Sequence, residues 1–154
     1  MKISEYGKWL LLFSLFLLSC NLWHWITEPE EPAGIRVSMD KSRYTAKDSI
    51  RVTLHNGTDK PVYLEGCNVF YLNTAVDTGW VVKAMRICVW EGYAQKVEPG
   101  KRFSETFPPG GYMTKGVHRF TVPTYYDCVD GKPISQAECG SKSIIIGPTF
   151  AVIP

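Results

Sequence analysis

The sequence predicts an all-β fold, an antiparallel sandwich of two sheets with about seven to nine strands. Three observations predict it. Short runs that alternate apolar and polar residues recur from Gly34 to the C-terminus. Turn residues separate these runs about every ten positions, and no run carries a helical period. Without helices to cover a parallel sheet, two antiparallel sheets are expected to bury one face of each other.

The strands are expected in a regular order along the chain. Ile35 to Met39 alternates apolar and polar side chains, and Ile50 to His55 does the same, which places Ile50 and Leu54 on one face. Pro61 opens the next strand, where a missing amide donor is tolerated. The remaining strands are expected near Val62 to Cys67, Val69 to Asn73, Trp80 to Val89, Arg102 to Phe107, Gly116 to Val122 and Ser143 to Ile153.

Turn residues mark the breaks between these strands. The segment Asn56-Gly57-Thr58-Asp59-Lys60 is expected to be a turn, because Asn-Gly can adopt the left-handed backbone angles that a tight turn needs. Further breaks are expected at Asp77-Thr78-Gly79, Glu98-Pro99-Gly100 and Pro108-Pro109-Gly110-Gly111.

The N-terminal segment predicts export from the cytoplasm. Lys2 and Lys8 precede an apolar run from Trp9 to Leu18 that only Ser14 interrupts. As a helix this run would rise about 15 Å, about half of a bilayer's hydrocarbon core, so a permanent transmembrane helix is disfavoured. Residues 1–19 are therefore interpreted as a cleaved signal peptide, and residues 34–154 as a single domain.

The end of the apolar run, Leu17-Leu18-Ser19-Cys20, resembles the lipobox of bacterial lipoproteins. The resemblance implies that the thiol of Cys20 receives a diacylglyceryl group and that cleavage makes Cys20 the mature N-terminus. The membrane would then be a partner through the lipid on Cys20, because two or more acyl chains hold a protein firmly. The alternative is an ordinary signal peptide in which the cysteine is incidental.

Residues 20–33 are expected to form a lipidated N-terminus and a flexible tether. Trp23 and Trp25 either contact the membrane interface or are exposed linker residues. The Pro- and Glu-rich stretch from Glu28 to Pro32 favours an extended chain. Asn21 is not the aspartate that retains many such lipoproteins at the inner membrane, so the outer membrane is expected. The periplasmic face and the cell surface both stay open.

Charge and cysteine content limit the partners further. Removal of residues 1–19 leaves 15 basic and 14 acidic residues, and this balance predicts neither a nucleic-acid partner nor a membrane-surface partner. With Cys20 lipidated, four cysteines remain, and export permits them to pair. Of three possible pairings, Cys67 with Cys88 and Cys128 with Cys139 is favoured, because each pair brackets a hairpin or a long loop. No two are spaced closely enough for a typical zinc site.

Several short motifs resemble small bacterial immunoglobulin-like domains found on exported lipoproteins. The resemblance spans residues 35–153 and implies an immunoglobulin-like β-sandwich. Two departures are His118, where such domains place a corner tyrosine, and a long insert from Thr124 to Ser141. The motifs are Tyr44-x-x-x-Asp48-x-Ile50-x-Val52-x-Leu54-x-Asn56, then Thr58, Pro61-Val62-Tyr63 and Cys67, and later Trp80, Pro99-Gly100 and Gly116-x-His118-x-Phe120.

Catalysis and cofactors are not predicted. His24 lies in the tether and His55 on a polar face, and His118 is expected to hydrogen-bond in place of the corner tyrosine. The chain lacks the usual nucleophile, zinc-protease and phosphate-loop motifs, so it is interpreted as a non-enzyme without cofactor or metal. A copper site is disfavoured because the methionines are not clustered with the histidines in sequence.

The insert supplies the candidate binding loop, which consists of Tyr125, Tyr126, Asp127 and Asp130 closed by Cys128 and Cys139. Tyrosine offers a large contact area at a small entropy cost, and a disulfide restricts the loop further. The alternative is that the tyrosines pack locally and hold the loop in place. A calcium site at Asp127 and Asp130 is supported only by an Asp-x-x-Asp pattern, which is common in loops.

The sequence therefore predicts a membrane-anchored lipoprotein of the cell envelope that acts as a non-catalytic binding module for a protein or a glycan. A protease inhibitor that presents the disulfide-constrained loop is one alternative. An accessory spacer domain of an envelope complex is the other.

Overall fold

The computed structural model describes residues 34–66, 68–83, 94–110, 113–134 and 138–154. Its regular structure consists of strands, which confirms the all-β prediction for these residues. No helix among them is long and apolar enough to cross a membrane. The predicted signal peptide (residues 1–19), the tether with Cys20 (residues 20–33), Cys67 and Cys88 lie outside the described residues.

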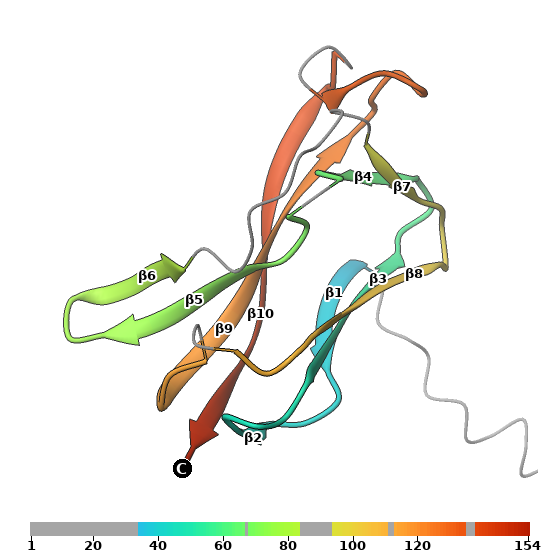
Figure 1. Ribbon diagram of the computed structural model, residues 1–154. Coiled ribbons are helices and arrows are strands. Elements are labelled where there is room, and N and C mark those ends of the chain that lie inside the picture. The colour runs from blue at the N-terminus through green and yellow to red at the C-terminus, as the bar shows by residue number, and fades with distance from the viewer. Residues whose placement is uncertain (1–33, 67, 84–93, 111–112, 135–137) are drawn as a thin grey trace, which may run out of the picture. The chain divides into compact units, whose positions relative to one another are not determined.

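The strands form two sheets (Figure 1). A three-stranded sheet has the order β1-β3-β8, and a seven-stranded sheet has the order β2-β10-β9-β4-β7, with β5 also paired to β9 and β6 paired to β5. Neighbours pair antiparallel except β2, which runs parallel to β10. The strands are β1 (Gly34–Met39), β2 (Arg43–Thr45), β3 (Ile50–Gly57), β4 (Val62–Leu64), β5 (Tyr71–Val76), β6 (Gly79–Lys83), β7 (Gln95–Val97), β8 (Arg102–Phe107), β9 (Gly116–Tyr126) and β10 (Ser141–Ile153).

Strand β3 shows why the sequence alternation produces a sandwich. Ile50, Val52 and Leu54 are fully buried, whereas the residues between them are exposed or half-buried. Ile50 lies opposite Phe107 on β8, so both side chains leave the sheet on the same side. This apolar side of the three-stranded sheet packs against the other sheet.

Aromatic rings connect the two sheets across the core. Phe107 of β8 stacks on Phe120 of β9 with ring centroids 5.4 Å apart, and Phe120 stacks in turn on Phe150 of β10 at 5.6 Å. Phe70 contacts Phe107 and Phe120 edge-on. Burial of large rings from both sheets accounts for much of the hydrophobic stabilisation.

The turn predicted over residues 56–60 begins later than expected, because β3 continues through Gly57 and bends follow at residues 58–60. Asn56 is fully buried, and its amide group donates to the carbonyl oxygens of Lys60 at 2.8 Å and Val97 at 2.9 Å. Its carbonyl oxygen accepts from the Thr58 amide at 3.1 Å. Asn56 therefore fixes the following loop from a strand position, since its side chain supplies hydrogen bonds that buried backbone groups need.

Strand β9 is longer than expected. The strand predicted from Gly116 to Val122 continues to Tyr126, because β10 pairs with it along its whole length, from Val152 opposite Gly116 to Ser141 opposite Tyr126. The insert expected from Thr124 is correspondingly shorter. Strands β2 and β7, with three residues each, are not in the predicted set.

An irregularity interrupts β10 between Ile146 and Thr149. Gly147 lies in it, at a close approach of strands: a Cβ atom there would come 2.9 Å from Cγ1 of Val37 and 3.2 Å from the carbonyl oxygen of Phe120. Ile146 and Phe150 are four residues apart, so a regular strand would place their side chains on the same face. Because of the bulge, Phe150 points inward while Ile146 points outward.

Candidate functional site

The predicted disulfide between Cys128 and Cys139 is present in the structure. It closes the segment between the end of β9 and the start of β10. The predicted pair of Cys67 with Cys88 lies outside the described residues. The described part of the chain therefore contains one of the two expected covalent links.

The four candidate loop residues do not form one surface. Tyr125 and Tyr126 are the last residues of β9 rather than loop residues, so their side chains leave opposite faces of the sheet. Tyr126 points inward and packs against the core, and its hydroxyl oxygen lies 3.3 Å from the hydroxyl oxygen of Thr124. Tyr125 points outward and donates its hydroxyl to Glu65 at 2.5 Å.

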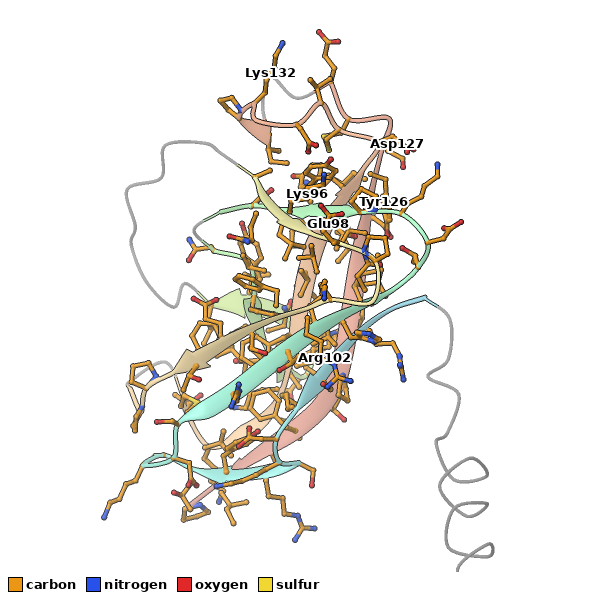
Figure 2. The ribbon with its side chains drawn as sticks, turned by 90° about the vertical axis from the view of Figure 1, so that its right-hand side faces the viewer. Lys96, Glu98, Arg102, Tyr126, Asp127 and Lys132 are labelled. Atoms are coloured by element: carbon orange, nitrogen blue, oxygen red, sulfur yellow. A yellow bond between two sulfur atoms is a disulfide. The ribbon has the colours of Figure 1, made fainter. Side chains whose placement is uncertain are left out.

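The two aspartates hold the loop against neighbouring strands. Asp127 has a left-handed backbone (φ 51°) and accepts from Lys60 at 3.1 Å. Asp130 accepts from the Tyr63 hydroxyl at 2.6 Å and from Lys96 at 2.9 Å, and these two bonds lower its pKa. In Figure 2, Lys96 and Asp127 lie at the end of the molecule that carries this loop.

These contacts show how the disulfide loop is held in place. The bonds of Asp130 hold the loop through Tyr63 and Lys96, whereas the alternative expected local packing of Tyr125 and Tyr126 to hold it. Among the described residues, no group of three or more His, Cys, Asp or Glu side chains could hold a metal ion, so the calcium hypothesis gains no support.

Tyrosine side chains instead gather on the outer face of the seven-stranded sheet. Tyr71 of β5 and Tyr125 of β9 both donate to Glu65, at 2.7 and 2.5 Å, so one carboxylate fixes two rings. Burial and the bond to Glu65 raise the pKa of Tyr71 to about 12, and the same two causes raise the pKa of Tyr125. Both phenols therefore remain neutral hydrogen-bond donors at physiological pH.

Cations lie over the aromatic rings of this face. The Arg119 guanidinium is 4.1 Å from the centroid of the Trp80 ring, which comes from the neighbouring β5–β6 hairpin. The Lys142 ammonium is 4.8 Å from the Tyr125 ring centroid and 4.0 Å from the Glu65 carboxylate. Lys96 lies over Tyr63 at 5.9 Å in a looser contact. Such contacts hold long side chains in defined positions.

Exposed aliphatic side chains accompany the rings. Ile144 and Ile146 of β10 are 61% and 58% exposed, although isoleucine is among the residues most often buried. Their partners on β9 are Pro123 and Thr121, which face outward with them. We call the set of outward-facing residues the outer face of the large sheet: Tyr63, Tyr71, Trp80, Val82, Val117, Arg119, Thr121, Pro123, Tyr125, Lys142, Ile144 and Ile146.

Two hollows of the described surface are small. One of about 180 Å³ lies beside Tyr63, Lys96 and Asp130, and one of about 230 Å³ lies beside Met39 and Pro148. Pockets for small ligands typically measure about 300–1,000 Å³. Neither of these two hollows is large enough to enclose such a ligand, whereas the outer face of the large sheet offers an extended surface.

His118 is fully buried on β9, consistent with the structural role expected for it. Its Nε2 lies 2.8 Å from the Thr114 carbonyl oxygen, so this nitrogen carries the hydrogen and donates. Nδ1 then accepts from the Thr74 hydroxyl at 3.0 Å. The ring stacks on Phe150 at 5.4 Å, and burial lowers the pKa of His118.

The site residues predicted from the sequence include little of the outer face of the large sheet. Glu65 immediately follows β4, and its partners are six and sixty residues away along the chain. Ile144 and Ile146 alternate correctly within β10, but alternation does not say which apolar residues face the core when both faces carry some. The run Ile144-Ile145-Ile146 could have indicated this face, because consecutive apolar residues in a strand place apolar side chains on both sides of the sheet.

No protein-family model matches this chain, and no curated protein sequence matches it. Among solved structures, the structural-genomics target SoR45 is similar with a TM-score of 0.46 and 17% sequence identity. The match covers 79% of this chain and 88% of that one. Function therefore has to be inferred from the residues of the chain itself.

Proposed function

We propose that this protein is a cell-envelope lipoprotein, anchored through a lipid on Cys20 in the outer membrane, whose immunoglobulin-like domain is a non-catalytic module that binds a protein. The observation that carries the binding role is the outer face of the large sheet, where exposed isoleucines adjoin rings fixed by Glu65, Arg119 and Lys142.

The strand order supports the immunoglobulin-like assignment. In such domains strands A, B and E share one sheet, and C, F and G share the other. Here β1, β3 and β8 are adjacent in the small sheet, and β4, β9 and β10 are adjacent in the large one. Taking β1 as A and β10 as G reproduces this arrangement. His118 donating to a carbonyl four residues upstream parallels the bond of a corner tyrosine.

The lipid anchor rests on the signal sequence and on Leu17-Leu18-Ser19-Cys20. It is tested by the intact mass of the protein purified from membranes. We expect a chain that begins at Cys20 and carries lipid, and a Cys20→Ser variant that lacks this species. An unmodified chain that begins at another residue would contradict the anchor.

The residue types on the outer face of the large sheet favour a protein partner. Interface cores are enriched in Tyr, Trp and Arg, and depleted of unpaired charge. Tyr71, Tyr125 and Trp80 are held in place by neighbouring side chains, so little additional ordering is needed on binding. Exposed Ile144 and Ile146 supply the apolar area that such a contact would bury.

A pair of single substitutions tests the location of the contact. Ile144→Asp places a charge on the outer face of the large sheet, and Val129→Asp places one in the disulfide loop, where Val129 is 46% exposed. After crosslinking in cells and purification of tagged protein, we expect Ile144→Asp to lose the main partner at least tenfold and Val129→Asp to keep it. Equal recovery from both variants, or loss only with Val129→Asp, would contradict this contact face.

The Cys128–Cys139 disulfide keeps a protease inhibitor as a second candidate, because it constrains the loop at both ends. Purified full-length protein should then inhibit a serine, cysteine or metalloprotease, and Val129→Asp should weaken the inhibition. No inhibition and no cleavage within residues 128–139 would end this candidate.

A further inference from the structure

Arg119 lies within the outer face of the large sheet, with strands on both sides of it. On β9 it lies opposite Thr149 of β10 and opposite Asn73 of β5, and Asn73 lies in turn opposite Val82 of β6. Figure 1 shows the β5–β6 hairpin beside β9. The guanidinium of Arg119 is 4.1 Å from the ring centroid of Trp80 on β6, and this contact holds the long side chain against the hairpin.

Aliphatic side chains surround this guanidinium. Val117 and Thr121 are the neighbours of Arg119 on the same face of β9, because every second residue returns to one side of a strand. Ile146 of β10 lies opposite Thr121. The side chains of Val82, Val117 and Ile146 are all exposed. A single positive charge therefore lies within an exposed aliphatic area.

Arg119 has no carboxylate partner in the described part of the chain. Strands β2, β5, β6, β9 and β10 contain no aspartate and no glutamate. Glu65, which follows β4, accepts from two tyrosines and lies 4.0 Å from Lys142. Nε of Arg119 is buried and has no hydrogen-bond partner. The contact with Trp80 therefore positions the guanidinium but leaves its hydrogen-bonding capacity unused.

We infer that Arg119 binds an acidic side chain, an aspartate or a glutamate, of the protein that covers the outer face of the large sheet. The inference rests on the proposed function, which places a protein on this face. An arginine that a partner covers loses its hydration, and a buried charge is costly unless an opposite charge pairs with it. A carboxylate can accept two parallel hydrogen bonds from a guanidinium, so it matches this group in both charge and geometry.

The residues around Arg119 define the chemistry of the partner surface. Val82, Val117 and Ile146 require apolar contacts, so the partner should present its carboxylate among aliphatic or aromatic side chains. An acidic glycan also carries a carboxylate, but its hydroxyl groups would need hydrogen-bond partners that these aliphatic groups lack. Trp80 is a positioning residue, because it restrains the guanidinium before the partner arrives and so reduces the entropy lost on binding.

Substitutions of Arg119 test the pairing through recovery of the main partner after crosslinking in cells. Arg119→Gln removes the charge and should lower the recovery at least tenfold. Arg51→Gln is the matched control, because it makes the same change at an exposed arginine of the small sheet, and it should keep full recovery. Equal recovery from these two variants would overturn the inference.

Arg119→Lys provides a second variant that keeps a cation beside the Trp80 ring. The ammonium cannot donate two parallel hydrogen bonds in a fixed plane, so the recovery should fall severalfold but stay above that of Arg119→Gln. Circular dichroism of each purified variant establishes that its sheets are intact. Unchanged recovery with Arg119→Lys would overturn the paired geometry.

Conservative and non-conservative changes at Trp80 test its positioning role. Trp80→Phe keeps an aromatic ring beside the guanidinium and should retain most of the recovery. Trp80→Leu keeps an apolar side chain but removes the ring, so it should lower the recovery severalfold. Equal recovery from the two variants would overturn the positioning role of Trp80.

A zero-length crosslinker identifies the group that position 119 contacts. Membranes from cells that express tagged Arg119→Lys are treated with a water-soluble carbodiimide, which joins the introduced amine to an adjacent carboxylate as an amide and is itself converted to a urea. Mass spectrometry should find the peptide that contains residue 119 joined to an aspartate or glutamate of the partner. The wild-type arginine does not react and is the control. A link to a sugar acid, or to a carboxylate within the same chain, would overturn the inference.

Comparison with Ile144→Asp separates this inference from the proposed function. Loss of the partner with Ile144→Asp, but full recovery with Arg119→Gln, would overturn the acidic contact and leave the contact face standing. Full recovery with both variants would overturn the contact face and the acidic contact together.

Discussion

His118 illustrates how one buried residue links three strands and a loop. It lies on β9, accepts from Thr74 of β5, stacks on Phe150 of β10, and donates to the Thr114 carbonyl in the preceding loop. Burial lowers the pKa of His118, and the Lys83 ammonium acts in the same direction, while the bond to Thr114 opposes them. The folded state therefore favours the neutral ring.

This pKa direction predicts a stability profile. In the unfolded chain the histidine takes up a proton near pH 6.5, whereas the folded state resists protonation to lower pH. The free energy of unfolding should therefore be highest above pH 6.5 and decrease as the pH falls below it. Denaturant titrations at pH 7.5, 6.5 and 5.5 measure this. His118→Gln should show a smaller decrease over the same range, and an unchanged slope would contradict the assignment.

The hydrogen bonds of the buried Asn56 side chain give a second prediction at the residue scale. Asn56→Ala leaves the carbonyls of Lys60 and Val97 without their side-chain donor and should lower the free energy of unfolding by about 2–4 kcal/mol. Asn56→Asp keeps the acceptor for Thr58 but loses both donors, so it should destabilise at least as much. Denaturant unfolding checks both. A fully stable Asn56→Asp variant would mean that the donated bonds contribute little.

The sequence predicted burial correctly for residues in runs that alternate apolar and polar side chains. It did not predict the position of residues whose environment depends on contacts with distant parts of the chain. Ile50, Val52 and Leu54 are buried as their alternation predicted. Asn56 has a strong turn propensity, but it is a buried strand residue because loop carbonyls from Lys60 and Val97 converge on it. Propensity describes local preference and contains no information on such convergence.

At the scale of elements, the bulge in β10 depends on the absence of a side chain at Gly147. Gly147→Ala would bring a methyl group within 2.9 Å of the Val37 side chain and should cost about 1–3 kcal/mol of stability. Gly140→Ala, just before β10, is a control, since its nearest neighbour, Cβ of Asp127, is 3.4 Å away. Thermal unfolding distinguishes them. Equal melting temperatures would contradict the close packing of β1 on β10.

The disulfide loop gives a prediction about local order. Asp130→Ala removes the bonds from Tyr63 and Lys96 and should speed hydrogen exchange in residues 129–132. Asp127→Asn removes only the charge of an exposed contact with Lys60, keeps a residue type that tolerates the left-handed backbone, and should affect these amides less. Exchange measured by mass spectrometry compares them. Indistinguishable rates in the two variants would show that the disulfide alone orders the loop.

Element boundaries were predictable only where turn chemistry marks them. The break at Asp77-Thr78 separates β5 from β6 as expected. The end of β9 was misplaced because Thr124, Tyr125 and Tyr126 looked like the start of a cysteine-closed loop, whereas pairing with β10 extends the strand. Strands of three residues, such as β2 and β7, are too short to show an alternating pattern.

At the scale of the whole molecule, the two outer faces of the sandwich differ in chemistry. The large sheet exposes isoleucines beside fixed aromatic rings, and the small sheet exposes arginines among hydroxyl groups. The sequence predicted the sandwich but not this division, because assigning residues to faces requires the strand register. We propose only the outer face of the large sheet as the contact with a protein partner.

Site-specific photo-crosslinking in cells tests the proposed contact face most directly. A photoreactive amino acid replaces Ile144 on the large sheet in one variant and Ser104 on the small sheet in another. We expect a discrete protein adduct from position 144 and no such adduct from position 104. The same protein adduct from both positions, or an adduct from position 104 alone, would contradict the account.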